Sequence, residues 1–222
     1  MSQKPYEIIA QPYEVWTAPL GTAFPNVGTD PTAPWALLGT SGNLNYDDDG
    51  ITVSHEQKVE LWRSLGSTGP RKGFRTEEDM TIALKLVDMS LEQYRRALND
   101  NTVTTTAAGV QTAGSKKVGL SRGLEVKQFA LLLRGRNSSA YGYGNSQYEV
   151  PVAIQAGKPK PKFMKGKPAT LDLEFQVLED LLAASEDERF GRLVVQVSAA
   201  IGSASVSPSA SKSPSASPSP SS

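Results

Sequence analysis

Hydrophobic and polar residues alternate along much of this chain with a period of two, which is the pattern of half-buried β-strands. The alternation is clearest in "TLDLEFQVLED" (170–180) and in "TIALKLVD" (81–88). One face of these two strands is therefore predicted to be buried and the other wet. The apolar positions are Ile82, Leu84, Leu86, Leu171, Leu173, Phe175 and Val177.

Further strands are predicted on both sides of these two. "LEVKQFALLLR" (124–134) is nearly apolar at its end, which is typical of a central strand. "YEVPVAIQA" contains Pro151, which places it at an edge or a bulge. The remaining strand-like runs are "RLVVQVS" (192–198), "PYEVWTAPLGTAF" (12–24) and "APWALLGTSGNL" (33–44).

One segment, "DMSLEQYRRALND", has a helical pattern instead. Ser90 can act as the N-cap and Gln93 is its capping-box partner. Leu91, Tyr94 and Leu98 then fall on one face at helical spacing. The segment is predicted to form a helix of two to three turns that packs against a sheet.

Two long connections complete the pattern. Residues 99–121 are rich in Thr, Ala and Gly and predict a loop with a short edge strand at 102–106, and "LEDLLAASEDERF" (178–190) predicts a loop with a helical turn. The predicted fold is mainly β, a sandwich or barrel of about eight to ten strands with one flanking α-helix and long loops. Long loops in a compact domain usually serve function or partner contact.

Composition divides the chain into two parts. From Ser203 it is almost entirely Ser, Ala and Pro. Such a segment buries too little apolar surface to offset the entropy that it would lose on ordering. We therefore predict a folded β-domain over residues 1–202 and a disordered tail over 203–222.

Charge and chemistry narrow the function. Lys plus Arg and Asp plus Glu number 23 each, which disfavours a strongly basic nucleic-acid binder. The chain has no cysteine and one histidine, His55, so thiolate catalysis and Cys-ligated metal are excluded. We expect no enzyme activity, no cofactor, no metal and no membrane partner, because the sequence has no catalytic set, signal-peptide h-region or apolar span.

The acidic run "YDDDG" (46–50) is the candidate for a metal site. Calcium loops place their acids at alternate positions and end in a bidentate Glu, whereas here Asp47, Asp48 and Asp49 are consecutive. The favoured interpretation is an acidic turn that enters the strand "GITVSHEQKVEL".

The connection "RSLGSTGPRKGFRTEED" (63–79) is glycine-rich and basic, then acidic. It lacks the G-x-x-x-x-G-K-[ST] order of a phosphate loop. It also precedes a strand, so no helix N-terminus is offered to a phosphate. We expect a long connection between two strands that contacts other proteins. Its charged residues are Arg63, Arg71, Lys72, Arg75, Glu77, Glu78 and Asp79.

A second basic run, "KPKPKFMKGK" (158–167), contains no acid. Three interpretations are open: a phosphate-contacting arm, a solvated loop held extended by its prolines, and a contact with acidic patches of a neighbouring subunit. The lysines are Lys158, Lys160, Lys162, Lys165 and Lys167.

The order of these segments resembles that of the tail tube (major tail) proteins of long-tailed bacteriophages. The likeness rests on "W..LG.SG.L" leading into "DDGITV", then "LGSTGPRK..RTEED", an alternating strand and "DMSLEQYRRALN". The closing pair "LDLEFQVLED…RFGRLVV" adds to it. The resemblance covers most of residues 13–198 and excludes the Ser/Pro tail.

The resemblance implies a β-sandwich or barrel that assembles into hexameric rings stacked as a tube in the virion tail, made in the host cytoplasm. Implied partners are further copies of the chain and the tape measure, tail terminator and baseplate or tail-tip proteins. Viral DNA would pass through the lumen without specific binding, so we expect the basic residues at subunit contacts. The alternative is a non-enzymatic virion module that binds carbohydrate or a host surface. The charged sets of 47–49, 63–79 and 158–167 form the predicted assembly interface.

Overall fold

The structure, a computed structural model, describes residues 7–197. Within this range the chain has ten strands and one short α-helix, as the period-two pattern predicted. The strands are β1 (Tyr13–Pro19), β2 (Ala36–Leu37), β3 (Tyr46–Trp62), β4 (Lys72–Leu86), β5 (Val103–Thr106), β6 (Ser115–Val118), β7 (Gln128–Gly135), β8 (Ser146–Gln155), β9 (Leu171–Val177) and β10 (Arg192–Val195). The helical segments are α1 (Leu91–Tyr94) and the 3-10 turns η2 (Gly42–Asn45), η3 (Arg95–Leu98) and η4 (Glu186–Glu188). The predicted tail, 203–222, lies outside the described residues.

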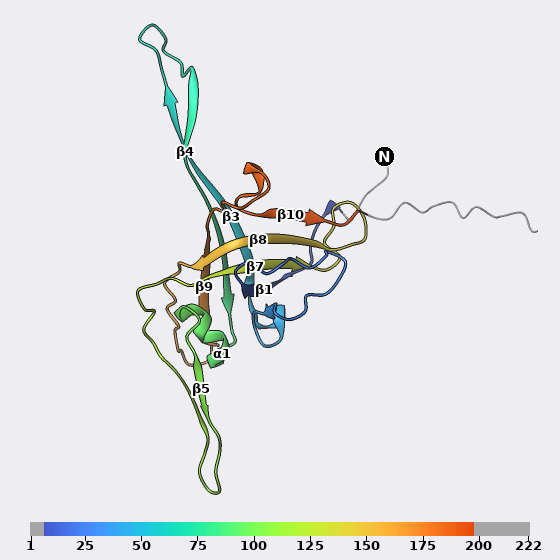
Figure 1. Ribbon diagram of the computed structural model, residues 1–222, viewed down its shortest axis with the longest axis vertical. Coiled ribbons are helices and arrows are strands. Elements are labelled where there is room, and N and C mark those ends of the chain that lie inside the picture. The colour runs from blue at the N-terminus through green and yellow to red at the C-terminus, as the bar shows by residue number, and fades with distance from the viewer. Residues whose placement is uncertain (1–6, 198–222) are drawn as a thin grey trace, which may run out of the picture.

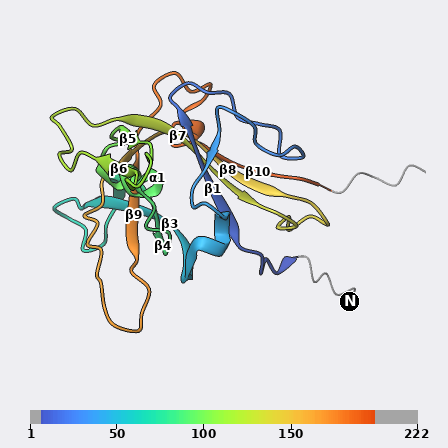
Figure 2. The ribbon, with the colours of Figure 1, turned by 90° about the horizontal axis from the view of Figure 1, so that it is seen from below.

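Eight strands form one antiparallel sheet in the order β2-β1-β7-β8-β9-β4-β3, with β10 pairing β8. The sheet curls so that the group β1, β7 and β8 faces the group β9, β4 and β3 across the core (Figure 2). The hydroxyl of Tyr46 in β3 bridges the two groups. It accepts a hydrogen bond from the Val15 N–H (2.9 Å) and donates one to the Leu38 carbonyl (2.9 Å). The sheet is therefore nearly closed on itself.

The core lies on the concave side of this sheet. The predicted apolar face is confirmed, because none of its seven residues is more than 3% exposed. Burial of each such side chain contributes about 1.5–3 kcal/mol. Val15, Leu131 and Leu133 complete the core from the facing strands. β7 lies between β1 and β8, which confirms the central strand expected from its apolar run.

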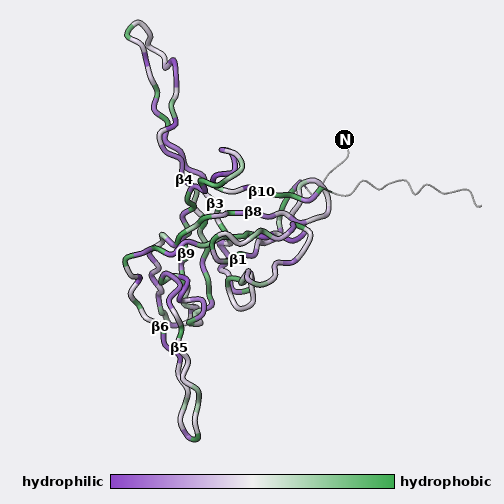
Figure 3. Tube along the Cα trace, in the orientation of Figure 1, coloured by the Kyte–Doolittle hydropathy of each residue, from purple (hydrophilic) through white to green (hydrophobic). Residues whose placement is uncertain are grey.

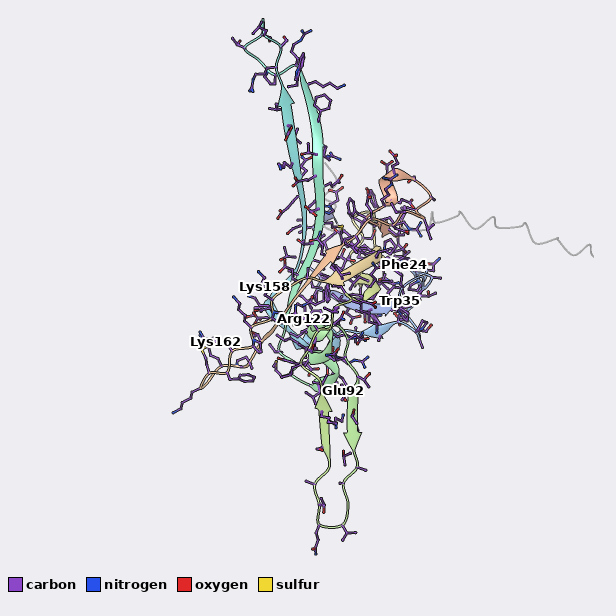
Figure 4. All side chains as sticks on the ribbon, turned by 60° about the vertical axis from the view of Figure 1, so that its left-hand side comes forward. Phe24, Trp35, Glu92, Arg122, Lys158 and Lys162 are labelled. Atoms are coloured by element: carbon purple, nitrogen blue, oxygen red, sulfur yellow. The ribbon has the colours of Figure 1, made fainter. Side chains whose placement is uncertain are left out.

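The convex side of β1 and β7 is covered by the segment 20–35. Trp35 packs there against Leu132, and its ring centroid lies 5.3 Å from that of Phe24 (Figure 4). The buried side chain of Arg134 fastens the same segment, since its guanidinium donates to three carbonyl oxygens. They belong to Asn26, Val27 and Thr29.

Pro151 lies at an irregularity of β8, as predicted. The register between β7 and β8 shifts from Phe129↔Ala153 to Leu131↔Val150. On its other side β8 pairs β10 up to Glu149 and β9 only from Ala153. Pro151 therefore falls where neither neighbour needs its missing N–H.

The predicted helix is shorter and less regular than expected. Residues 91–94 are α-helical and 95–98 continue as a 3-10 turn. The Ser90 side chain makes no capping hydrogen bond, which corrects the capping-box prediction. Asp88 instead accepts the Ser90 N–H (2.9 Å). Leu98 is buried as predicted, while Tyr94 is half-buried against the core.

The predicted connection 63–79 is half strand. β4 begins at Lys72, so only residues 63–71 join it to β3, and 72–79 pair with β3. The acidic run also belongs to a strand: β3 begins at Tyr46, and the register shifts between Tyr46 and Ile51. The predicted acidic turn is thus an irregular strand start, where Gly50 adopts a φ of +68°.

Residues 99–121, predicted as a loop with one edge strand, form a separate two-stranded ribbon of β5 and β6. This ribbon and the outer part of the β3–β4 hairpin leave the body in opposite directions along its longest axis (Figure 1). The loop 178–190 contains a single helical turn, η4, as predicted.

Candidate assembly surfaces

The β3–β4 arm, residues 55–79, is the most protruding part of the described chain (Figure 1). Its two strands stay paired as far as Trp62↔Lys72. The third strand, β9, ends its pairing with β4 at Thr81↔Gln176. Beyond that point no other strand of residues 7–197 pairs with the ribbon, and every residue from His55 to Arg63 is exposed.

Several charged side chains of the arm have partners. Lys58 pairs with Glu77 (2.9 Å), and Arg75 pairs with Glu78 (3.0 Å) and bonds Gln57 (3.1 Å). Asp79 accepts a hydrogen bond from the Gln176 amide (3.1 Å). Exposed pairs of this kind contribute at most about 1 kcal/mol each. They maintain the register of the ribbon more than they stabilise the fold.

Apolar side chains lie on both faces of the outer arm. Val59 and Leu61 pack over Gly73, where an added Cβ would lie 3.3 Å from Val59. Phe74 lies on the other face, with the Lys72 ammonium 5.0 Å from its ring centroid. The exposed fractions of Val59, Leu61, Trp62 and Phe74 lie between 46% and 54%. An isolated two-stranded ribbon is marginally stable in water, so such a surface is expected to need a partner.

The tip of the arm, residues 63–71, carries the remaining predicted residues. Leu65 is fully exposed there, and Figure 3 shows a hydrophobic segment at this end of the trace. The Arg71 N–H donates to the Trp62 carbonyl (2.8 Å) and closes the loop. Arg63 and Arg71 are both exposed.

The acidic run at the start of β3 is remote from the tip. Asp48 and Asp49 are exposed, and Asp49 forms an ion pair with Lys85. The hydrogen bond and charge of Asp49 raise the pKa of Lys85. Trp62 lies thirteen residue steps along β3 from Asp49, a distance of about 43 Å at ~3.3 Å per step.

The lysine loop, residues 158–167, joins β8 to β9 and projects from the body (Figures 2 and 4). All five lysines are exposed, and none forms an ion pair within residues 7–197. Phe163 is 75% exposed among them. Met164 beside it is 43% exposed, so the loop offers positive charge without an ion-pair partner in the described residues, around two apolar side chains.

The structure thus separates the predicted residues into three surfaces. The charged residues of 63–79 share the β3–β4 arm, whereas 47–49 and the lysine loop lie elsewhere on the body. Sequence reasoning missed the β5–β6 arm, residues 103–118. The Lys116 ammonium at its base pairs with Glu92 of α1 (2.6 Å; Figure 4). The sequence pattern that could have predicted this arm is two strand-like runs, "VTTT" and "SKKV", on either side of a Gly-containing turn.

The described residues contain no group of three or more His, Cys, Asp or Glu side chains that could hold a metal ion. His55 is an exposed β3 residue paired with Met80, as expected for a strand histidine. No helix in this part of the chain is long and apolar enough to cross a membrane.

No protein-family model and no curated protein sequence matches this chain. Solved structures similar to it include a chain of the anti-feeding prophage (AFP) baseplate, with a TM-score of 0.47 and 10% identity, covering 88% of this chain and 98% of that one. A chain of the native gene transfer agent (GTA) virion has a TM-score of 0.36 and 11% identity, covering 69% and 89%. A chain from the tail of the empty GTA particle has a TM-score of 0.37 and 10% identity, covering 81% and 96%.

Proposed function

We propose that this protein is a structural virion subunit that self-assembles through its arms into the tail tube of a long-tailed bacteriophage. The observation that carries the proposal is the pair of ribbon arms that leave the body in opposite directions, one of them with apolar residues on both faces. Arms of this kind reach a neighbour at each end of the subunit. Contacts between different surfaces of identical subunits either close into rings or propagate as fibres.

The sequence resemblance supports a more specific proposal. The subunits would form a tube of stacked hexameric rings in the virion tail, assembled in the host cytoplasm, through which the genome is delivered. Partners would be further copies and the tape measure, tail terminator and baseplate or tail-tip proteins. The proposed subunit contacts include the β3–β4 arm, Asp47, Asp48, Asp49 and the lysine loop, whose opposite charges can set register between copies.

A matched pair of proteins tests the proposal: the full chain and a variant in which residues 58–77 are replaced by Asn-Gly. Gln57 and Glu78 already pair, so a two-residue turn can close the shortened hairpin. The full chain should form six-fold rings or hollow tubes in negative-stain micrographs. The variant should stay monomeric in sedimentation analysis while its free energy of unfolding changes by less than about 1 kcal/mol.

Two results would overturn the proposal. One is a full chain that stays monomeric at every concentration and instead binds glycans, which would favour the carbohydrate-binding alternative. The other is a shortened variant that still forms tubes, which would remove the arm from the contact.

A further inference from the structure

A pocket of about 360 Å³, which we call the η3 pocket, opens beside η3 at one end of the curled sheet. Its apolar walls include Pro19, Pro34, Phe129 and Phe175. The rings of Phe129 and Phe175 meet edge to face, with centroids 5.5 Å apart. The volume lies within the range typical of ligand sites.

Besides Asp100 Oδ1, which forms ion pairs, two buried polar atoms of residues that line this pocket have no hydrogen-bond partner in the described part of the chain. They are the hydroxyl oxygen of Thr17, a residue only 3% exposed, and the amide nitrogen of Gln155. Buried polar groups are normally hydrogen-bonded, and leaving one unpaired costs about 1–3 kcal/mol. The pocket is therefore expected to bind a group that supplies both a donor and an acceptor, as a peptide backbone does.

Its rim is cationic. One carboxylate, that of Asp100, receives Arg95 (3.0 Å), Arg96 (3.0 Å) and Lys127 (2.6 Å). Three positive charges around one negative charge leave a net excess of two. Burial lowers the pKa of Arg96 while Asp100 opposes that effect, so an added carboxylate would relieve the excess positive charge.

The chain itself carries a segment of complementary character, which we call the acidic leucine loop, residues 178–190. It contains five acidic residues and one arginine. Leu181 and Leu182 are 79% and 93% exposed at its turn, where the Leu182 N–H donates to the Asp180 carboxylate (2.9 Å). In Figure 1 this loop lies on the β10 side of the body, away from α1 and η3.

We infer that the acidic leucine loop of one copy binds the η3 pocket of the next, an inference that rests on the proposed self-assembly. Leu182 would cover Phe129 and Phe175, backbone groups would satisfy Thr17 and Gln155, and the acids would face Arg95 and Lys127. Pocket and loop are different surfaces of the same subunit, so the contact is head-to-tail and can close a ring.

Charge distinguishes the acidic leucine loop from the arm tip, which also carries an exposed leucine. Leu65, at the tip of the β3–β4 arm, is fully exposed but has Arg63 and Arg71 nearby in the sequence. Its insertion would bring further positive charge to a pocket that already has an excess, which is unfavourable.

The absence of cysteine from the chain allows a clean crosslinking test. Ala36, an exposed residue at the pocket, and Ala184, an exposed residue of the acidic leucine loop, are both changed to Cys, and the assembled full-length protein is treated with a short bis-maleimide. A ladder of covalent oligomers is expected in denaturing gels. The matched control is Ala36→Cys with Leu65→Cys, which should give no ladder. A second variant, Leu181→Ser with Leu182→Ser, should raise the concentration needed for assembly at least tenfold and leave the unfolding midpoint unchanged.

The outcomes separate this inference from the proposed function. Tubes or rings without the 36–184 ladder, or with the ladder in the control, would overturn the loop-to-pocket contact and leave self-assembly standing. A serine variant that assembles normally would also overturn the contact. A full chain that never assembles would defeat both.

Discussion

The inner and outer halves of the β3–β4 hairpin are the same two strands in opposite environments. In the inner half, Met80, Ile82, Leu84 and Leu86 are at most 5% exposed, because β9 pairs β4 and the facing strands cover it. In the outer half, Leu61 and Phe74 are about half exposed, although the strand pairing continues without a third strand. Pairing alone therefore does not bury a strand.

The difference assigns separate tasks to the two halves. Apolar residues of the inner half are covered within one chain and stabilise the monomer. In the proposed assembly, those of the outer half would gain burial when another chain binds, and their contribution would be to association. Mutations that are chemically similar should then have different readouts, depending on which half they occupy.

The largest expected effect belongs to the inner half. Leu84→Ala should lower the free energy of unfolding by about 2–5 kcal/mol, because it leaves a cavity in the core. Urea denaturation monitored by circular dichroism measures it, with the exposed Leu61→Ala as the matched control at less than about 0.5 kcal/mol. Equal losses for both variants would mean that the outer half is already buried in the monomer.

The outer half should respond in assembly instead. In Leu61→Ser with Phe74→Ser, each change removes apolar surface whose burial contributes about 1.5–3 kcal/mol. The concentration at half-assembly should therefore rise by at least about tenfold, as light scattering and micrographs can measure, while the unfolding midpoint stays the same. Unchanged assembly would show that the ribbon faces remain in solvent in the polymer.

The same contrast explains which parts of the fold could be predicted. Alternation encodes burial where a strand has a wet and a dry face, so 81–86 and 171–177 were predicted with their buried residues. In 72–79 the sequence is nearly all polar, and no alternation marks "KGFRTEED" as strand. Its strand structure comes from pairing with β3, which is not visible within the segment.

The η3 pocket could not be predicted from the sequence. Thr17, Asp100, Phe129 and Phe175 come from β1, the end of η3, β7 and β9, and only the topology brings them together. Asp100 also has a φ of +58°, a backbone state that the segment's helical pattern did not predict. Candidate residues within one run, such as the lysines, were found because neighbours in sequence share a loop.

The lysine loop extends the comparison to a surface with charge and little apolar area. Lys160→Glu with Lys162→Glu should raise the concentration at half-assembly by roughly twofold to fivefold, because exposed pairs contribute up to about 1 kcal/mol. The effect should fade as salt is added, and folding should be unaffected. If the wild-type chain binds DNA, and the variant loses that binding while it assembles normally, the phosphate-contacting interpretation would be favoured instead.

The smallest effect concerns the β5–β6 arm, which is held to α1 by Lys116 and Glu92. The hydrogen bond from Lys116 lowers the pKa of Glu92. A carboxylate whose pKa is depressed in the folded state stabilises that state above its ordinary pKa, and the contribution is lost as the pH falls through the lowered value. The protection factors of the amides in 103–118, which correct for the intrinsic pH dependence of exchange, should therefore fall in acid before those of the core. In Lys116→Met the exchange should already be faster at neutral pH and the Glu92 carboxyl should titrate at a higher pH, both measurable by NMR. An arm whose exchange is independent of both changes would be held by its strand pairing alone.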